Sequence, residues 1–193
     1  MTAPQRTLIL GGARSGKSAH AEQLALASGK ELVYIATAQA HDAEMAARIE
    51  LHKQRRIAGN GSGDDVRWIT VEQPLALGGA LAQWCAPQRL VLVDCLTVWL
   101  SNLLFSEQRD YPDIGRIDPP ACFAEQRGLF LRGLAQAAGD VILVANEVGM
   151  GVVPQGAVSR WFVDEAGRLN QAVAAVCERA VFVVAGLPMV LKG

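Results

Sequence analysis

The chain lacks the charge imbalance of a protein that binds a polyanion. Its 193 residues include 18 Lys and Arg against 19 Asp and Glu, which gives a formal net charge of -1 at pH 7. Nucleic-acid binding usually requires a basic surface that contacts phosphates. Because the sequence has no basic block, we expect no nucleic-acid partner.

Long apolar runs are also missing, although hydrophobic residues make up 51% of the chain. No run approaches the roughly 20 apolar residues that cross a bilayer as a helix. The first six residues do not have the pattern of a signal peptide. We therefore expect no stable membrane insertion and a cytoplasmic location.

The four cysteines show no Cys-x-x-Cys pair, and no histidine lies at metal-binding spacing from them. Widely scattered cysteines of this kind are typical of reduced, mostly buried thiols in a reducing compartment. The pattern argues against a disulfide framework or a zinc site. The residues concerned are Cys85, Cys95, Cys122 and Cys177.

What the sequence does contain is a phosphate-binding pattern directly after the apolar residues 7–10. It comprises Gly11, Gly12, Ala13, Arg14, Ser15, Gly16, Lys17 and Ser18. Glycines let the backbone direct its N–H groups at phosphate oxygens, and the following helix adds the positive end of its dipole. In this P-loop motif Lys17 reaches the outer phosphates and Ser18 ligates Mg²⁺. The sequence therefore predicts a nucleotide-binding protein.

Apolar strand patterns and helix patterns alternate along the chain. The expected strands cover residues 7–10, 31–36, 66–72, 90–94, 140–145, 180–185 and, at a sheet edge, 187–191. The expected helices cover residues 17–28, 42–56, 96–105, 121–138 and 159–179, with another that has Pro74 in its first turn. This alternation predicts an α/β fold of the P-loop NTPase type, RecA-like, with a mostly parallel sheet and helices on both faces. The length favours a single P-loop catalytic domain over residues 1–193.

Several further candidate residues stand where expected strands end. Asp94 closes a continuous apolar run, as the Mg²⁺-binding Walker B residue does in P-loop proteins. Ligands of open α/β sheets lie at the carboxyl ends of the strands, so Ala36, Thr37 and Ala38 are candidates to border the nucleotide. An equal alternative is that Thr37 only ends a strand. Glu72 is either functional or an acidic residue at the start of a helix.

A polar stripe runs along the expected helix 42–56. Glu44, Arg48, His52 and Arg55 recur at helical spacing, which places them on one face. Such a stripe is usually a solvated surface, but an imidazole between two guanidinium groups also suits a phosphate-handling site. The expected helix 96–105 is strongly apolar, which indicates core or a subunit interface.

Several stretches of the chain match motifs that occur together in one known family. They are Gly11–Ser18, Tyr34–Thr37, Asp42-x-Glu44-Met45-x-x-Arg48-Ile49-x-x-His52, Trp68-x-Thr70-x-Glu72, Asp94–Thr97, Asn146–Pro154 and Gly167-Arg168-x-Asn170-Gln171. From about Thr7 to Lys192 the chain resembles the bifunctional adenosylcobinamide kinase / adenosylcobinamide-phosphate guanylyltransferase of cobalamin biosynthesis. The resemblance implies phosphorylation of the aminopropanol hydroxyl of adenosylcobinamide by GTP or ATP, then transfer of GMP from GTP through a histidine to give adenosylcobinamide-GDP.

The resemblance also implies roles for particular residues and partners. His52 falls where the family carries GMP, and Arg48, Lys53 or Arg55 would neutralise charge on the α-phosphate. Glu72 and Asp94 fall at positions tied to nucleotide or metal binding. Relatives form oligomers, trimers among them, so we expect a homo-oligomer, with residues 96–105 as the candidate interface.

Other functions remain possible from the sequence alone. In a plain small-molecule kinase, Lys17, Ser18 and Asp94 would transfer the γ-phosphoryl group and His52 would be a surface residue. Two alternatives remain: a nucleotide-dependent regulatory module, and a nucleotide-binding protein that catalyses no reaction. His20 and His41 are poorer nucleophile candidates than His52, because the first lies on the expected P-loop helix and the second in a turn.

Overall fold

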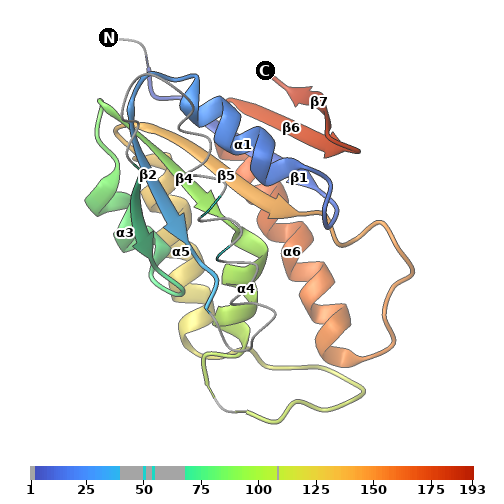
Figure 1. Ribbon diagram of the computed structural model, residues 1–193. Helices are drawn as coiled ribbons and strands as arrows, with labels where there is room; N and C mark the ends of the chain where they lie inside the picture. Colours follow the sequence, from blue (N-terminus) through green and yellow to red (C-terminus); the bar gives the residue numbers. More distant parts are fainter. Residues whose placement is uncertain (1–2, 40–49, 51–53, 55–67, 108) are drawn as a thin grey trace.

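The strands of the chain form one seven-stranded sheet (Figure 1). The computed structural model describes residues 3–39, 50, 54, 68–107 and 109–193. The strand order is β3-β2-β4-β5-β1-β6-β7, and β7 runs antiparallel to β6 while the other paired strands are parallel. The strands are β1 (Arg6–Gly11), β2 (Glu31–Ala36), β3 (Ile69–Glu72), β4 (Arg89–Asp94), β5 (Asp140–Asn146), β6 (Arg179–Val184) and β7 (Leu187–Lys192).

Helices cover both faces of the sheet. On one face, α1 (Lys17–Leu26) packs through Ala21 and Ala25 against Ile9, Leu92 and Val144. The other face carries a larger core made with α3 (Leu77–Trp84), α4 (Leu96–Leu104), α5 (Cys122–Ala135) and α6 (Ala157–Val176). Its centre includes Trp99 and Phe130, whose ring centroids lie 4.9 Å apart. The predicted α/β architecture with helices on both faces is therefore confirmed.

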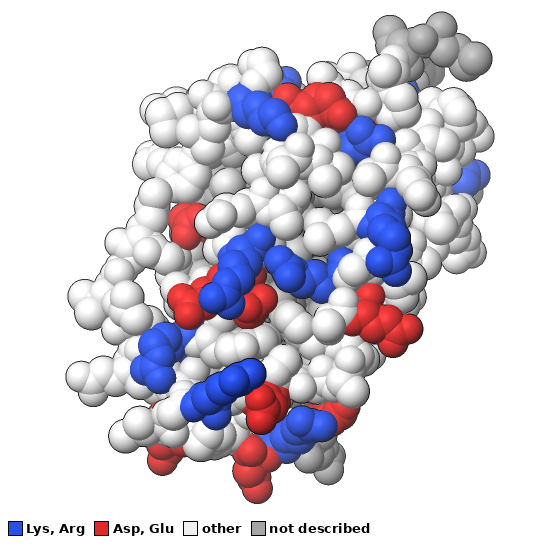
Figure 2. All heavy atoms as spheres, turned by 180° about the vertical axis from the view of Figure 1, so that it is seen from behind, with Lys and Arg blue, Asp and Glu red and all other residues white. Residues whose placement is uncertain are grey.

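Charges of both signs are mixed on the face seen in Figure 2, where Lys and Arg alternate with Asp and Glu. That face has no extended basic area. Within the described part of the chain, no helix combines the length and apolarity needed to cross a membrane. All four cysteines are free thiols. Burial raises the pKa of Cys95 and of Cys177 to about 12.

The boundaries of some elements differ from the predicted ones. The helix expected at Pro74 begins at Leu77, because the side chain of Gln73 accepts hydrogen bonds from the N–H groups of Leu75 and Ala76 and holds a turn there. The last long helix begins at Ala157 and stops at Val176, earlier than the predicted 179. The expected helix 42–56 lies almost wholly outside the described residues.

The predicted role of residues 96–105 as a subunit interface is wrong for most of their apolar side chains. Five of these residues are at most 1% exposed and belong to the core of the chain itself, namely Leu96, Trp99, Leu100, Leu103 and Leu104. Phe105, which follows α4, is 57% exposed. The helix is strongly apolar because it packs in the core with residues of α3, α5 and α6 and, at Leu104, with Tyr111 and Ile117.

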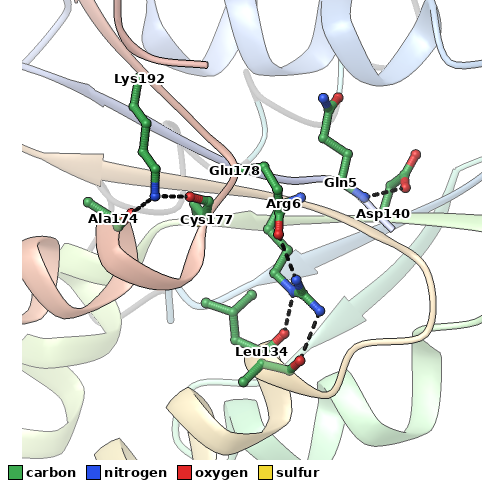
Figure 3. A network of polar contacts seen from close by, with 9 residues as sticks. Gln5, Arg6, Leu134, Asp140, Ala174, Cys177, Glu178 and Lys192 are labelled. Carbon is green, nitrogen blue, oxygen red and sulfur yellow. Dashed lines mark hydrogen bonds and ion pairs between the residues drawn. The ribbon is translucent and has the colours of Figure 1, made fainter. Parts of the chain in front are cut away.

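At the amino-terminal edge of the sheet, two cations bind the carboxyl ends of helices (Figure 3). The guanidinium of Arg6 donates to the carbonyl oxygens of Leu134 at 2.7 Å and Ala135 at 2.8 Å, where α5 ends. Lys192 donates to the carbonyl of Ala174 at 2.9 Å and to that of Cys177, where α6 ends. Cations at helix carboxyl ends offset the negative end of the helix dipole. These contacts fasten both helices at the edge opposite the P-loop.

Candidate functional site

The carboxyl ends of the parallel strands bring the predicted site residues to one edge of the sheet. Gly11 at the end of β1 pairs with Asn146 at the end of β5. Ala36 at the end of β2 pairs with Asp94 on one side and Glu72 on the other. Ligands of open α/β sheets bind at this edge. The structure therefore places the P-loop, Asp94 and Glu72 on the same edge.

The phosphate-binding loop makes a tight turn that depends on its glycines and on close packing. A Cβ atom at Gly11 would lie 2.5 Å from the hydroxyl of Ser15 and 2.5 Å from the carbonyl oxygen of Val183, so only glycine fits. Gly16 has φ 96°, in the left-handed region that favours glycine. Arg14 adopts φ 55° without being glycine, which stores strain at the loop. The loop thus reaches α1 in one compact turn.

Lys17 lies at the start of α1 and is only 9% exposed. Its ammonium donates to the carbonyl oxygen of Gly12 at 3.1 Å, within the loop itself. Burial lowers the pKa of Lys17, while the nearby carboxylate of Asp94 opposes that shift. The structure thus holds a buried cation whose partner is a weak neutral acceptor, an arrangement that a phosphate oxygen would improve.

Asp94 and Ser18 supply hard oxygen donors on the α1 side of the sheet. Asp94 follows Leu90 and Leu92 in alternation, and both leucines face α1. The hydroxyl of Tyr34 donates to Oδ2 of Asp94 at 3.3 Å. Among the described residues no cluster of three His, Cys, Asp or Glu exists to hold a metal. One carboxylate and one hydroxyl fit Mg²⁺, which keeps several waters and takes phosphate oxygens as ligands.

Thr37 fixes the turn that follows Asp94. Its buried hydroxyl accepts from the N–H of Cys95 at 2.8 Å and donates to the carbonyl of the same residue at 2.9 Å. The amide of Asn102 donates to the carbonyl oxygens of Thr37 at 2.7 Å and Pro74 at 3.1 Å. Thr37, one of the three residues predicted to border the nucleotide here, therefore holds the backbone of this turn. The other two, Ala36 and Ala38, flank it at the same edge.

Glu72 is exposed at the end of the edge strand β3. The alternative that it starts a helix is wrong, because α3 begins five residues later and has no acidic residue in its first turn. The functional interpretation of Glu72 stays a prediction.

The histidine candidates fall in different places. His52, Lys53 and Arg55 lie outside the described residues, as do His41 and Arg48. His20 lies on α1, and its Nε2 is enclosed with no hydrogen-bond partner within the described part of the chain. Burial and the nearby Arg179 lower the pKa of His20, which favours the neutral imidazole.

Sequence reasoning missed several polar residues that hold this edge together. The hydroxyl of Thr97 accepts from the N–H of Asn146 at 2.7 Å, and the amide of Asn170 donates to the carbonyl of Asn146 at 3.3 Å. Asn102 ties Thr37 to Pro74 as described above. The available signal was polar residues interrupting an otherwise apolar helix at positions 97 and 102.

Comparison with known proteins matches almost the entire chain. The family model CobU, described as cobinamide kinase / cobinamide phosphate guanyltransferase, matches residues 7–191. The bifunctional adenosylcobalamin biosynthesis protein CobP of Pseudomonas aeruginosa is 51% identical over 188 residues, covering 97% of this chain and 98% of that protein. The bifunctional adenosylcobalamin biosynthesis protein CobU of Salmonella typhimurium is 38% identical over 192 residues, covering 96% of this chain and 98% of that protein.

Solved structures with low sequence identity share the fold. The ATPase EscN of the type III secretion system of enteropathogenic E. coli superposes with a TM-score of 0.54 at 12% identity, covering 94% of this chain and 43% of that chain. Protein PH0250 of Pyrococcus horikoshii OT3 gives a TM-score of 0.52 at 8% identity, covering 100% of this chain and 88% of that chain. Together with the strand order, the likeness to an ATPase confirms the predicted P-loop NTPase fold class.

Proposed function

The chain belongs to the cobinamide kinase / cobinamide phosphate guanyltransferase family, and we propose that it performs both reactions at the edge of the sheet described above. It transfers the γ-phosphoryl group of GTP or ATP to the aminopropanol hydroxyl of adenosylcobinamide. It then transfers GMP from GTP to the new phosphate and so gives adenosylcobinamide-GDP. The observation that carries this proposal is the family match over residues 7–191, which includes the P-loop.

In the kinase reaction, the P-loop residues Gly11, Gly12, Ala13, Arg14, Ser15, Gly16, Lys17 and Ser18 bind the phosphates. Lys17 exchanges its contact with the carbonyl of Gly12 for contacts with the β- and γ-phosphates. Ser18 and Asp94 would hold Mg²⁺, which would neutralise charge on those phosphates. Ala36, Ala38 and Glu72 border the nucleotide at the same edge. Catalysis here consists of positioning and of stabilising charge in a loose transition state.

In the guanylyl transfer, the imidazole of His52 attacks the α-phosphorus of GTP. A P–N bond forms, the bond from the α-phosphorus to the bridging oxygen breaks, and pyrophosphate leaves. A phosphate oxygen of the phosphorylated corrinoid then attacks the same phosphorus, and the P–N bond breaks. Lys53 and Arg55 offset the charge that builds on the α-phosphate. The support is the polar stripe in the sequence together with the family resemblance of that segment.

Labelled GTP separates this mechanism from that of a single-activity kinase. We expect label at the α-phosphate to become attached to the protein as an acid-labile adduct, and to be lost in His52→Ala. Label at the γ-phosphate should instead move to adenosylcobinamide, and this transfer should persist in His52→Ala. Transfer of γ-label without any covalent α-label would show that the protein is a P-loop kinase alone.

We also propose that the protein acts in the cytoplasm as a homo-oligomer, with a trimer as the first possibility to test. The β6–β7 hairpin exposes a group of apolar side chains that supports association, namely Val184, Leu187, Met189, Val190 and Leu191. Light scattering at micromolar concentration tests this directly, and a monomeric mass would refute it.

A further inference from the structure

Asn146, the last residue of β5, directs its side chain to the same side of the sheet as the P-loop helix. In β5, Ile142 and Val144 pack in the cluster that contains α1, whereas Leu143 and Ala145 pack in the cluster on the other face. Side chains alternate along a strand, so Asn146 follows Ile142 and Val144. It also pairs in register with Gly11, the first glycine of the phosphate-binding loop.

The main chain of Asn146 is held from two helices. Its N–H donates to the hydroxyl of Thr97 at 2.7 Å, and its carbonyl accepts from the amide of Asn170 at 3.3 Å. The next residue, Glu147, donates its N–H to the carbonyl of Gly11 at 3.1 Å. This set of bonds fixes the end of β5 between the P-loop strand and the strand that carries Asp94.

The side-chain oxygen of Asn146 accepts no hydrogen bond from the described residues. Oδ1 is enclosed, and it has no hydrogen-bond partner among the residues that the structure describes. An enclosed amide oxygen without a donor is unfavourable, and native proteins rarely keep one without a reason. The hydroxyl of Ser15 is also enclosed and has no partner within the part of the chain that the structure describes, but it belongs to the phosphate-binding loop already assigned. Asn146 is thus an oriented acceptor beside that loop.

We propose that Oδ1 of Asn146 accepts a hydrogen bond from the side-arm hydroxyl of the corrinoid as this hydroxyl attacks the γ-phosphorus of the nucleotide. This assignment rests on the proposed kinase function. The hydroxyl oxygen forms the new O–P bond, the bond from the γ-phosphorus to the bridging oxygen breaks, and GDP or ADP leaves with that oxygen. The amide does not take up the proton, which passes to water once the ester has formed.

A carboxamide suits this position better than a carboxylate would. The γ-phosphate brings negative charge to the P-loop, and a second anion beside it would oppose nucleotide binding. A neutral amide oxygen orients the hydroxyl without that repulsion. In a loose phosphoryl transfer little proton transfer is needed at the transition state, so orientation is the useful contribution.

The test compares Asn146→Ala with Asn170→Ala. Both variants lose an amide near the end of β5, but Asn170 lies on α6, and its amide donates to the main-chain carbonyl of Asn146. For Asn146→Ala we expect kcat of γ-phosphoryl transfer to adenosylcobinamide to fall by a factor on the order of 30. The KM for the nucleotide should stay within about threefold, because the lost contact is with the acceptor. Asn170→Ala should keep kcat within about threefold of wild type.

Two further measurements exclude a merely structural role. The melting temperature of Asn146→Ala without nucleotide should be unchanged or higher, because the variant removes an unpaired enclosed acceptor. Covalent α-label from GTP should persist, since the lost contact belongs to the kinase step. If Asn146→Ala does not fold, Asn146→Ser provides the same measurements with a side chain too short to reach the hydroxyl.

The outcomes separate this assignment from the proposed function. An unchanged kcat in Asn146→Ala would overturn the assignment, whether or not the KM for the nucleotide rises. The proposed function would still stand if the wild-type protein transfers the γ-phosphoryl group. Loss of kcat to the same extent in both alanine variants would overturn the assignment as well. A wild-type protein that moves no γ-phosphoryl group to the corrinoid would instead refute the proposed function.

Discussion

Gly11 controls whether the phosphate-binding loop can close, because its missing side chain lets three segments meet. In Gly11→Ala the new methyl group would lie 2.5 Å from the main-chain oxygen of Val183 and 2.5 Å from the hydroxyl of Ser15. We expect a loss of about 1–3 kcal/mol in the free energy of unfolding, as overpacking usually gives. Denaturant unfolding of the nucleotide-free protein measures it. Gly12→Ala is the matched control, since a Cβ there meets no atom within 4 Å, and equal losses would contradict the prediction.

Replacing Lys17 should weaken nucleotide binding without lowering the stability of the nucleotide-free protein. Among the residues that the structure describes, the hydrogen-bond partner of the buried Lys17 ammonium is the carbonyl of Gly12 at 3.1 Å, and burial lowers its pKa. Lys17→Met should therefore leave the nucleotide-free melting temperature unchanged or higher. It should also weaken nucleotide binding by roughly 10- to 100-fold, the worth of a charge-assisted contact to phosphate.

Calorimetric titration with GTP and Mg²⁺ measures the affinity of this variant. Lys30→Met serves as the control, because Lys30 pairs with Asp140 at 2.8 Å at the amino-terminal edge of the sheet. Its loss should not alter nucleotide affinity. Equal affinities of Lys17→Met and wild type would show that Lys17 does not contact the phosphates.

At the scale of elements, Arg6 joins the first strand to the end of α5. Arg6→Met removes the donors to the carbonyls of Leu134 and Ala135. We expect the free energy of unfolding to fall by about 2 kcal/mol, from lost charge-assisted hydrogen bonds and helix-dipole interaction. For a domain of this length, that corresponds to a melting temperature lower by roughly 4–8 °C. Kinase activity of the folded protein should not change, because Arg6 lies at the edge opposite the P-loop.

The ion pair of Arg6 with Glu178 should contribute only a small part of that effect. Glu178 is 46% exposed, so solvent screens the pair. Burial alone would raise the pKa of Glu178, but hydrogen bonds from Arg6 outweigh it and hold the pKa below the ordinary 4.5. The stabilisation is therefore present above pH ~4.5 and is lost as the pH falls through the lower folded value. Glu178→Gln should be slightly less stable than wild type at pH 7 and equal to it at pH ~2.

The sequence predicted the buried strands well. It did not predict the hydrogen bonds of polar side chains that join the strands to neighbouring segments. The runs ending at Asp94 and Asn146 are continuous and apolar, because both faces of a central parallel strand are covered. The start of α3 was misplaced, since Pro74 suits a first helical turn but Gln73 holds a turn there. The partners of Thr37 and Asn102 come from segments far apart in the sequence, and local patterns do not report such contacts.

Strand ends and the P-loop have local signatures, so the sequence predicted which residues share one edge of the sheet. Gly11, Asp94 and Glu72 lie along that edge, at the ends of β1, β4 and β3, as strand register requires. The orientation of Asn146 depends on strand register and on which helix covers which face, so only the structure gave it. The assignment of His52 still depends on sequence and family resemblance.

Across the whole molecule, the two edges of the sheet have separate tasks. The amino-terminal edge holds helices through Arg6 and Lys192, as Figure 3 shows. The carboxyl edge holds the buried cation of Lys17 and the side-chain oxygen of Asn146, which has no partner among the described residues. Apart from tight-packing positions such as Gly11, we therefore expect stability and chemistry to depend on different residues. This separation allows variants at the carboxyl edge to lose activity without unfolding the chain.

Ligand binding should stabilise the whole chain, and Asp94 should make that stabilisation depend on Mg²⁺. At about 100 times its dissociation constant, a ligand adds about 2.7 kcal/mol, which for this length raises the melting temperature by roughly 5–10 °C. Asp94→Asn keeps an oxygen for the hydroxyl of Tyr34 but loses the charge that we propose holds the metal. In wild type, GTP with Mg²⁺ should therefore stabilise more than GTP with a chelator. In Asp94→Asn the two shifts should be equal, and thermal melts with and without Mg²⁺ compare them. A difference between these shifts as large as in wild type would place the metal on other ligands.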